Sequence, residues 1–220
     1  MCLALLTVFT GSLLAYHEGH LKKRLAWSSV SQVSYVLFGL STMNPVGLTG
    51  AILHAIAHSL IKDTLFMSAG AIIMKTEKTQ VADLKGIGKQ MPVTLACFTI
   101  ASLGLVGIPP CMGFVSKWYL AQGSLAATGV SAALNIIGPV VLLLSALLTA
   151  GYLFPIVIRG FIVGNGGHGH DAEPAETYVR NDAPWMMLVP LLVLAVLSVL
   201  IGMFPGKLID LLTTLGAALM

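Results

Sequence analysis

The sequence is poor in charged residues. Only 10% of its 220 residues are Asp, Glu, Lys or Arg, whereas 56% are hydrophobic. Soluble domains carry roughly 25% charged residues, so this scarcity excludes the soluble class. It also excludes nucleic-acid binding, because so few charges cannot form the basic, aromatic-studded surface which that binding requires. The long apolar runs that remain predict a membrane protein.

Candidate metal and cofactor ligands are scarce as well. Cys2, Cys97 and Cys111 lie in or beside apolar segments, without a C-x-x-C pair, and are typical of small buried hydrophobes. The segment GNGGHGHDAEPAE carries His168 and His170, which fit either a metal site or a flexible solvated connector. No further ligand spacing supports a specific metal. We therefore assign no metal and no redox cofactor to this chain.

The apolar runs predict an all-α membrane protein with six transmembrane helices. The expected spans are roughly 1–16, 25–43, 47–74, 91–122, 131–158 and 184–204. The first is not a signal peptide, because no basic residues precede it and basic residues follow it as a stop-transfer flank. Because this apolar run starts abruptly at residue 1, we expect the chain to begin in the middle of a larger membrane architecture. Residues 1–204 are expected to form one transmembrane domain, and 205–220 a short interfacial helix.

The fourth span is expected to be discontinuous. Gly107, Pro109, Pro110 and Gly113 fall inside it. Pro110 removes a backbone donor and disfavours helix at the residue before it, so the helix should break at Pro109–Pro110. Breaks at membrane depth are tolerated only where the backbone is buried in protein or lines a water-filled cavity.

The distribution of basic residues predicts the orientation in the membrane. Nine lie in the segments after the first, third and fifth spans, against one outside the spans on the other side: Lys22, Lys23, Arg24, Lys75, Lys78, Lys85, Lys89, Arg159 and Arg180 against Lys207. Positively charged segments stay on the cytoplasmic side. Both termini should therefore lie on the non-cytoplasmic side of the cell membrane.

A polar stripe runs through the third span. His54, His58 and Lys62 follow one another at intervals of four residues, so their side chains share one helix face over ~12 Å. A lysine in mid-membrane costs ~2.5–3.5 kcal/mol on insertion scales. Histidine passes protons near neutral pH, and lysine away from water can cycle between its charged and neutral forms. The stripe predicts a proton relay; histidines that merely bond neighbouring helices are the alternative.

Three other polar features accompany the stripe. Asp63 is a candidate counter-ion, for Lys62 or for a group on another helix. Lys117 lies just after the helix break, one turn beyond it, either as a charge controlled by a cavity or as a lysine reaching the membrane surface. The second span is rich in hydroxyl and amide groups, which either hold water beside the relay or join helices: Ser28, Ser29, Ser31, Gln32 and Ser34.

Three segments together resemble a known family. They are KKRLAWSSVSQVSYVLFGL, HAIAHSLIKDTLFMSAG and GIPPCMGFVSKWYL, in that order between residues 20 and 120. They are similar to a basic loop with a serine-rich helix, a His-x-x-x-His-x-x-x-Lys helix and a broken helix with a terminal lysine. These features belong to the proton-translocating, antiporter-like subunits of respiratory complex I, membrane-bound hydrogenases and Mrp-type Na⁺/H⁺ antiporters. Phe114-Val-Ser-Lys-Trp-Tyr is closer to the Mrp and hydrogenase branches.

The resemblance implies a fold and a role for each residue. The family's core is two inverted five-helix repeats, and this chain would supply the second repeat plus one final helix. Lys62 would be the central relay residue, Lys117 the terminal channel residue, and His54 and His58 the groups between them. Protons, or Na⁺ and protons, would move through a multisubunit complex powered by a redox arm or an opposing ion gradient. The implied partners are membrane lipid and other integral membrane subunits.

Two departures from the family pattern leave alternatives open. The first repeat, with its glutamate–lysine pair, is absent, so another chain must supply it or the chain is a truncated product. Asp63 stands where the family usually has a small or apolar residue. A non-translocating scaffold subunit is the alternative function, and whether the chain is part of an enzyme complex stays open.

Overall fold

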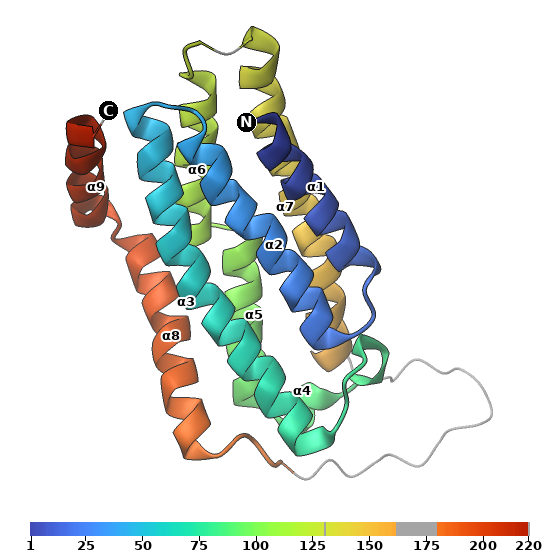
Figure 1. The fold of residues 1–220 in the computed structure, drawn as a ribbon. Helices are drawn as coiled ribbons and strands as arrows, with labels where there is room; N and C mark the ends of the chain where they lie inside the picture. Colours follow the sequence, from blue (N-terminus) through green and yellow to red (C-terminus); the bar gives the residue numbers. More distant parts are fainter. Residues whose placement is uncertain (130, 162–179, 220) are drawn as a thin grey trace.

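The structure is a bundle of helices that run roughly alongside one another (Figure 1). It is a computed structural model that describes residues 1–129, 131–161 and 180–219. Every regular element in these ranges is helical, and one isolated antiparallel bridge joins His20 to Gln80. The elements are α1 Cys2–His17, α2 Leu21–Leu40, α3 Pro45–Thr76, η1 Val81–Asp83, α4 Ile87–Gln90, α5 Pro92–Val106, α6 Met112–Leu125, α7 Ala132–Phe161, α8 Trp185–Met203 and α9 Gly206–Leu219.

Three of these helices are long and apolar enough to cross a membrane: α3, α7 and α8. α1 and α5 are apolar but shorter. The structure therefore agrees with a helical membrane protein, while the number of six spans stays a prediction. α2 begins at Leu21, four residues before the expected start, because Arg24 is buried and bonds to backbone carbonyls instead of lying in a loop.

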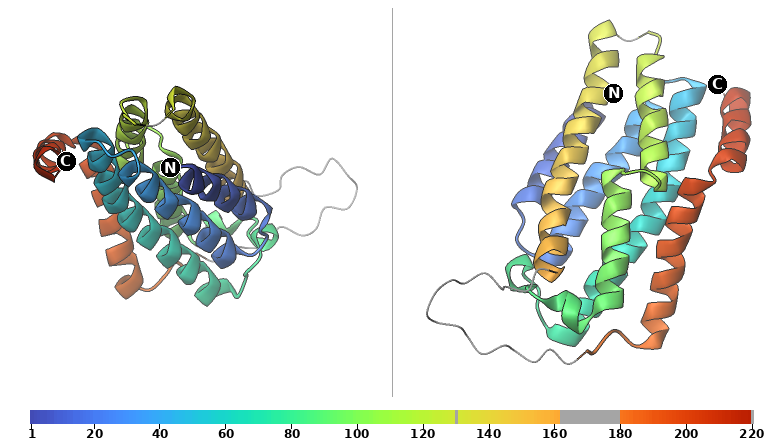
Figure 2. Two further views of the ribbon diagram at one scale, coloured as in Figure 1. Left: turned by 45° about the horizontal axis from the view of Figure 1, so that its top comes forward. Right: turned by 180° about the vertical axis from the view of Figure 1, so that it is seen from behind.

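α3 is the central helix of the bundle. It packs against α2, α5, α6, α8 and α9, while α1 packs against α2 and α7 (Figures 1 and 2). Asn44 caps the start of α3 by accepting a hydrogen bond from Gly47 N at 2.8 Å, and Pro45 occupies the first turn. The Asn44 amide also donates to the Gly123 carbonyl at 2.7 Å, which ties this end of α3 to α6.

The outer surface carries many large apolar side chains. Leu147 on α7, Val193 on α8 and Trp185 at the start of α8 are all more than half exposed. The interior, by contrast, holds many buried hydroxyl groups. Ser12, Ser31 and Ser145 bond to one another where α1, α2 and α7 meet. A surface of this kind is typical of a protein whose surroundings are lipid.

Two helices occupy the range for which one interrupted span is predicted. α5 ends at Val106 and α6 begins at Met112, with the cis-linked Pro109 and Pro110 between them. Gly107 takes φ 92°, a left-handed conformation that favours glycine, and closes α5. A Cβ at Gly113 would collide with the Gly104 carbonyl, so glycine there lets α6 lie close to α5.

The two termini lie at the same end of the bundle (Figure 1). The connection between α1 and α2, the residues from Thr76 to Met91, and the end of α7 lie at the other end. Lys78, Lys85, Lys89 and Arg159 belong to these segments, and Lys22, Lys23 and Arg24 lie next to them in the first turn of α2. α9 packs beside the first turns of α3, where Thr49 Oγ1 donates to the Leu212 carbonyl at 3.3 Å (Figure 2). An interfacial position for α9 stays a prediction.

Asp182 caps α5 from a distant part of the chain. Its carboxylate accepts hydrogen bonds from Val93 N at 2.8 Å, Thr94 N at 3.3 Å and Thr94 Oγ1 at 2.5 Å.

We expect Asp182→Ala to lower the free energy of unfolding by about 1–2 kcal/mol, because the first turn of α5 loses its acceptors. The midpoint of thermal unfolding in detergent, followed by circular dichroism, measures this loss. Asp210→Ala is the control, since Asp210 is exposed; an equal effect of both changes would contradict the capping role.

Candidate functional site

The predicted polar stripe faces the interior of the bundle. His54 and Lys62 are 2% and 4% exposed, and His58 is half-buried. The rings of His54 and His58 are stacked, with centroids 6.5 Å apart and planes 23° apart. All three side chains project from α3, and the hydrogen-bond partners of His54 and Lys62 come from α2 and α6. The structure thus brings the three titratable groups together in one buried row.

Lys62 is held by groups of the second helix. Its ammonium donates to the Leu25 carbonyl at 2.8 Å and to the Ser28 hydroxyl. It also lies 5.7 Å from the centre of the Phe66 ring. Among the described residues no carboxylate forms an ion pair with it. Neutral acceptors thus replace part of the hydration that a buried ammonium loses, and its charge is left uncompensated.

His54 is bonded through both ring nitrogens. Nδ1 lies 2.9 Å from Ser116 Oγ on α6, and Nε2 lies 3.1 Å from Gln32 Oε1 on α2. The Ser116 hydroxyl also donates to the Gly113 carbonyl at 3.1 Å, so its one proton serves either that carbonyl or Nδ1, and the tautomer of the His54 ring follows from which of the two it serves. His54 therefore joins three helices and can still take up a second proton if the Ser116 hydroxyl turns away. Both the bonding role and the relay role predicted above are compatible with this geometry.

Two buried polar atoms beside the row lack partners. His58 Nε2 and Gln32 Nε2 make no hydrogen bond with any described residue. Buried polar groups are nearly always bonded, either to protein or to ordered water. Both atoms lie along the stretch from Lys62 to His54, where a relay would need a further carrier of protons. The arrangement is chemically suited to water-mediated contacts at this point.

Lys117 points back into the break between α5 and α6. Its ammonium donates to the carbonyls of Leu105 and Val106 at 2.6 and 2.9 Å. These carbonyls end α5 and have no partner within that helix, and the negative end of the helix dipole favours a cation. Gly107, with φ 92°, leaves room beside it, because a Cβ there would lie only 3.1 Å from Lys117 Cδ. Lys117 is thus directed into the bundle and not toward a membrane surface.

Tyr35 connects His54 to Lys117, and sequence reasoning missed it. The Tyr35 ring stacks on His54 with centroids 5.0 Å apart, and the Lys117 ammonium lies 5.4 Å from the centre of the same ring. The Tyr35 hydroxyl donates to the Leu142 carbonyl on α7 at 3.0 Å. The spacing of Ser28, Gln32 and Tyr35 by four and three residues puts all three on one helix face, which was the available signal. Ser116, also missed, gave no such signal.

The polar residues of α2 divide between the two roles that the sequence left open. Ser28 and Gln32 contact the row. Ser31 instead donates to the Val8 carbonyl at 2.8 Å, and so joins α2 to α1. Ser29 and Ser34 bond to carbonyls of their own helix. Helix joining and contact with the row therefore coexist on different faces of one helix.

Asp63 is not brought to Lys62. It lies on the exposed side of α3, on the same face as the exposed Ser59, four residues earlier. Neighbouring residues on a helix are ~100° apart, which accounts for the separation. The two histidines of the glycine-rich segment, His168 and His170, lie outside the described residues. Within the described ranges, no group of three or more His, Cys, Asp or Glu side chains could hold a metal ion.

Comparison with known proteins identifies related chains. Residues 1–153 match the family described as "NADH:quinone oxidoreductase/Mrp antiporter, TM". The NADH-quinone oxidoreductase subunit N of Desulforudis audaxviator is 38% identical over 207 residues, which are 92% of this chain and 40% of that protein. Hydrogenase-4 component B of Escherichia coli is 33% identical over 215 residues, 92% of this chain and 31% of that protein.

A solved structure has the same fold. A chain of the Mrp complex from Dietzia sp. DQ12-45-1b superposes with a TM-score of 0.83 at 24% identity, over 97% of this chain and 45% of that one. This chain therefore spans less than half the length of the relatives it matches. The family match includes His54, His58, Lys62 and Lys117, together with the break between α5 and α6. The chain belongs to the NADH:quinone oxidoreductase/Mrp antiporter transmembrane family.

Proposed function

We propose that this chain conducts protons as one half of an antiporter-like subunit in a larger membrane complex. The observation that carries the proposal is the buried row that runs from Lys62 through His58 and His54 to Lys117. The relatives support the proposal, because they are a subunit of an NADH-quinone oxidoreductase and a component of a hydrogenase, and the similar structure is of an Mrp complex.

The row supplies a route for protons in steps. Lys62 is held only by neutral acceptors, so it can give up a proton without losing an ion pair. His58 receives it through water, and the stacked ring of His54 follows. Tyr35 and Ser116 bridge from His54 toward Lys117. A positive charge on one of these side chains disfavours a positive charge on its neighbour, and this electrostatic repulsion couples the proton-transfer steps.

The break between α5 and α6 gives the row its exit. We regard the two helices as halves of one discontinuous transmembrane helix, as sequence reasoning expected from Gly107, Pro109, Pro110 and Gly113. The carbonyls at the end of α5 stabilise Lys117 while it is charged. Loss of that proton to a water-filled opening would return Lys117 to its neutral form, ready to accept the next proton. Irregular backbone at membrane depth is suited to such an opening.

The placement in the membrane follows from the basic end of the bundle. We propose that this end faces the cytoplasm and that both termini lie outside, in the cell membrane. Residues 1–204 would form one transmembrane domain of six spans and 205–220 an interfacial helix. Energy would come from a redox arm or an opposing ion gradient in the complex, and the transported cation would be H⁺, alone or exchanged for Na⁺.

Replacement of the two lysines tests transport directly. We expect Lys62→Met and Lys117→Met each to reduce proton pumping at least about tenfold, because neither variant can carry a proton at its station. Acidification of inverted membrane vesicles, with and without Na⁺, measures pumping and distinguishes the cations. Lys89→Met is the control, since Lys89 is an exposed lysine away from the row.

The same experiment distinguishes transport from the scaffold alternative. The second candidate is a non-translocating scaffold, which the bonding of His54 to both α2 and α6 favours. Pumping that persists in both lysine variants, in complexes that still assemble, would support the scaffold and contradict transport. Copurification of the partner subunits with each variant checks that assembly is retained.

His54 separates proton transfer from simple helix bonding. We expect His54→Gln to reduce pumping, because an amide can keep bonds to Gln32 and Ser116 but cannot take up a proton. The unfolding temperature should change little. Normal pumping by His54→Gln, with a loss only in His54→Ala, would instead assign His54 a purely structural role.

Asp63 is proposed to serve a partner chain, since it faces away from Lys62. A carboxylate in mid-membrane is tolerated mainly where a basic or polar group meets it. A neighbouring helix that carries a lysine or arginine against this face of α3 would supply that group.

A neutral substitution tests this partner contact. We expect Asp63→Asn to reduce copurification of the partner subunits at least about tenfold, because a lost charged hydrogen bond costs about 1.5–3 kcal/mol. Ser59→Ala, on the same face, is the control for general disturbance of the surface. Unchanged copurification with changed proton pumping would assign Asp63 to the relay instead.

A further inference from the structure

A cavity with two arginines opens between α1 and α7 at the basic end of the bundle. Its volume is about 330 Å³, and its walls include Tyr16, Arg24, Gln80, Gly151, Pro155 and Arg159. The arginines are 135 positions apart, one in the first turn of α2 and one near the end of α7. No carboxylate belongs to the described walls of this cavity. The cavity is therefore a positively charged recess in a largely apolar surface.

Arg24 is fixed in position by backbone carbonyls. Nε donates to the Glu18 carbonyl at 2.6 Å, and Nη1 donates to the Tyr152 carbonyl at 2.9 Å. The residue is only 9% exposed, and Nη2 bonds to no described residue. The nearby Glu18 carboxylate accepts from His20 N at 3.0 Å and does not line the cavity. A guanidinium held in this way keeps a donor free without loss of side-chain entropy on binding.

Arg159 completes the recess from the other side. It is exposed, and its carbonyl accepts a hydrogen bond from Gly86 N at 3.1 Å, which fixes the end of α7 against the segment after η1. Gly151 lies opposite Tyr16: a Cβ there would come within 3.0 Å of the tyrosine ring. Two guanidiniums in one recess, with no acid between them, are suited to a phosphate oxygen pair.

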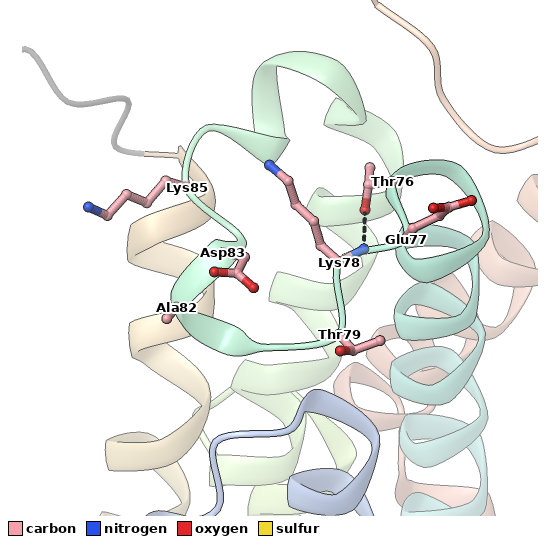
Figure 3. Close-up of a pocket in the computed structure, with 7 residues that line it drawn as sticks. All are labelled: Thr76, Glu77, Lys78, Thr79, Ala82, Asp83 and Lys85. Atoms are coloured by element: carbon pink, nitrogen blue, oxygen red, sulfur yellow. Dashed lines mark hydrogen bonds between the residues drawn. The ribbon is translucent and has the colours of Figure 1, made fainter. Parts of the chain in front are cut away.

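A second recess at the same end lacks this property. Figure 3 shows Glu77 and Asp83 beside Lys78 and Lys85 in its wall. Two carboxylates accompany two ammonium groups there, so the net charge of the wall is near zero. The contrast separates the arginine recess from the general positive charge of this end of the bundle.

We propose that the Arg24–Arg159 recess binds a phosphate group, carried by an anionic lipid headgroup or present as free phosphate. Basic pockets between membrane helices at the cytoplasmic side are suited to such headgroups. The surface next to the recess also fits a lipid. Leu13 on α1 and Leu147 on α7 lie about one turn from Tyr16 and Gly151, and both are exposed to receive acyl chains. The proposal is independent of proton transport.

Lipid retention tests the proposal on the full chain. The protein is reconstituted in phosphatidylcholine vesicles containing some phosphatidylglycerol, extracted in mild detergent and examined by native mass spectrometry. We expect Arg159→Gln to retain about tenfold less phosphatidylglycerol than the unmodified chain, because a charged hydrogen bond is lost. Lys85→Gln, which removes one charge from the other recess, should retain as much as the unmodified chain.

The outcomes are distinct. Equal losses in Lys85→Gln and Arg159→Gln, or full retention in Arg159→Gln, would overturn the proposal. A parallel arm adds inorganic phosphate, with chloride at equal ionic strength as the control. Displacement of the lipid by phosphate alone supports a phosphate site that accepts the free anion. Retention of the lipid in phosphate, together with its loss in Arg159→Gln, supports the headgroup as the source.

Discussion

The ammonium group of Lys62 must be enclosed and given hydrogen-bond acceptors, and the packing of α2 against α3 does both. A lone charge exposed to lipid would cost several kcal/mol. The Leu25 carbonyl accepts from the Lys62 ammonium, and it is also the acceptor for the Ser28 and Ser29 hydroxyls. The central position of α3, with five helices packed against it, follows from the need to keep its polar face away from lipid. The rest of the bundle is arranged around that face.

The break between α5 and α6 creates a second need for buried hydrogen-bond partners. Carbonyls freed at the end of a helix need partners when they are buried. Lys117 supplies donors to two of them, and Gly107 makes room for its side chain. Each element thus satisfies the other: the cation finds acceptors and the interrupted backbone finds a donor. Tyr35, stacked on His54 and facing Lys117, joins this unit to the stripe of α3.

Charge also organises the ends of the molecule. Arg24, expected in a loop, is drawn into the bundle because two carbonyls replace the water it gives up. Its burial extends α2 and creates one wall of the recess shared with Arg159. Asp63, in contrast, stays on the outer face of α3 because no described group offers it a bond. Arg24 thus finds its partners inside the chain, whereas Asp63 faces outward, where another molecule can supply one.

The sequence by itself determined the membrane class, the helical nature of the chain, the family and the common face of His54, His58 and Lys62, because composition and a period of 3.6 residues are local properties. It also predicted a break at Pro109–Pro110, since proline acts on its own backbone, and α5 ends before this pair while α6 begins after it. Only the tertiary structure decided that Tyr35 and Ser116 contact His54, that Lys117 turns inward, and that Asp63 points away from Lys62. These contacts join residues up to about eighty positions apart, and they depend on how helices pack, which no local pattern of residues records.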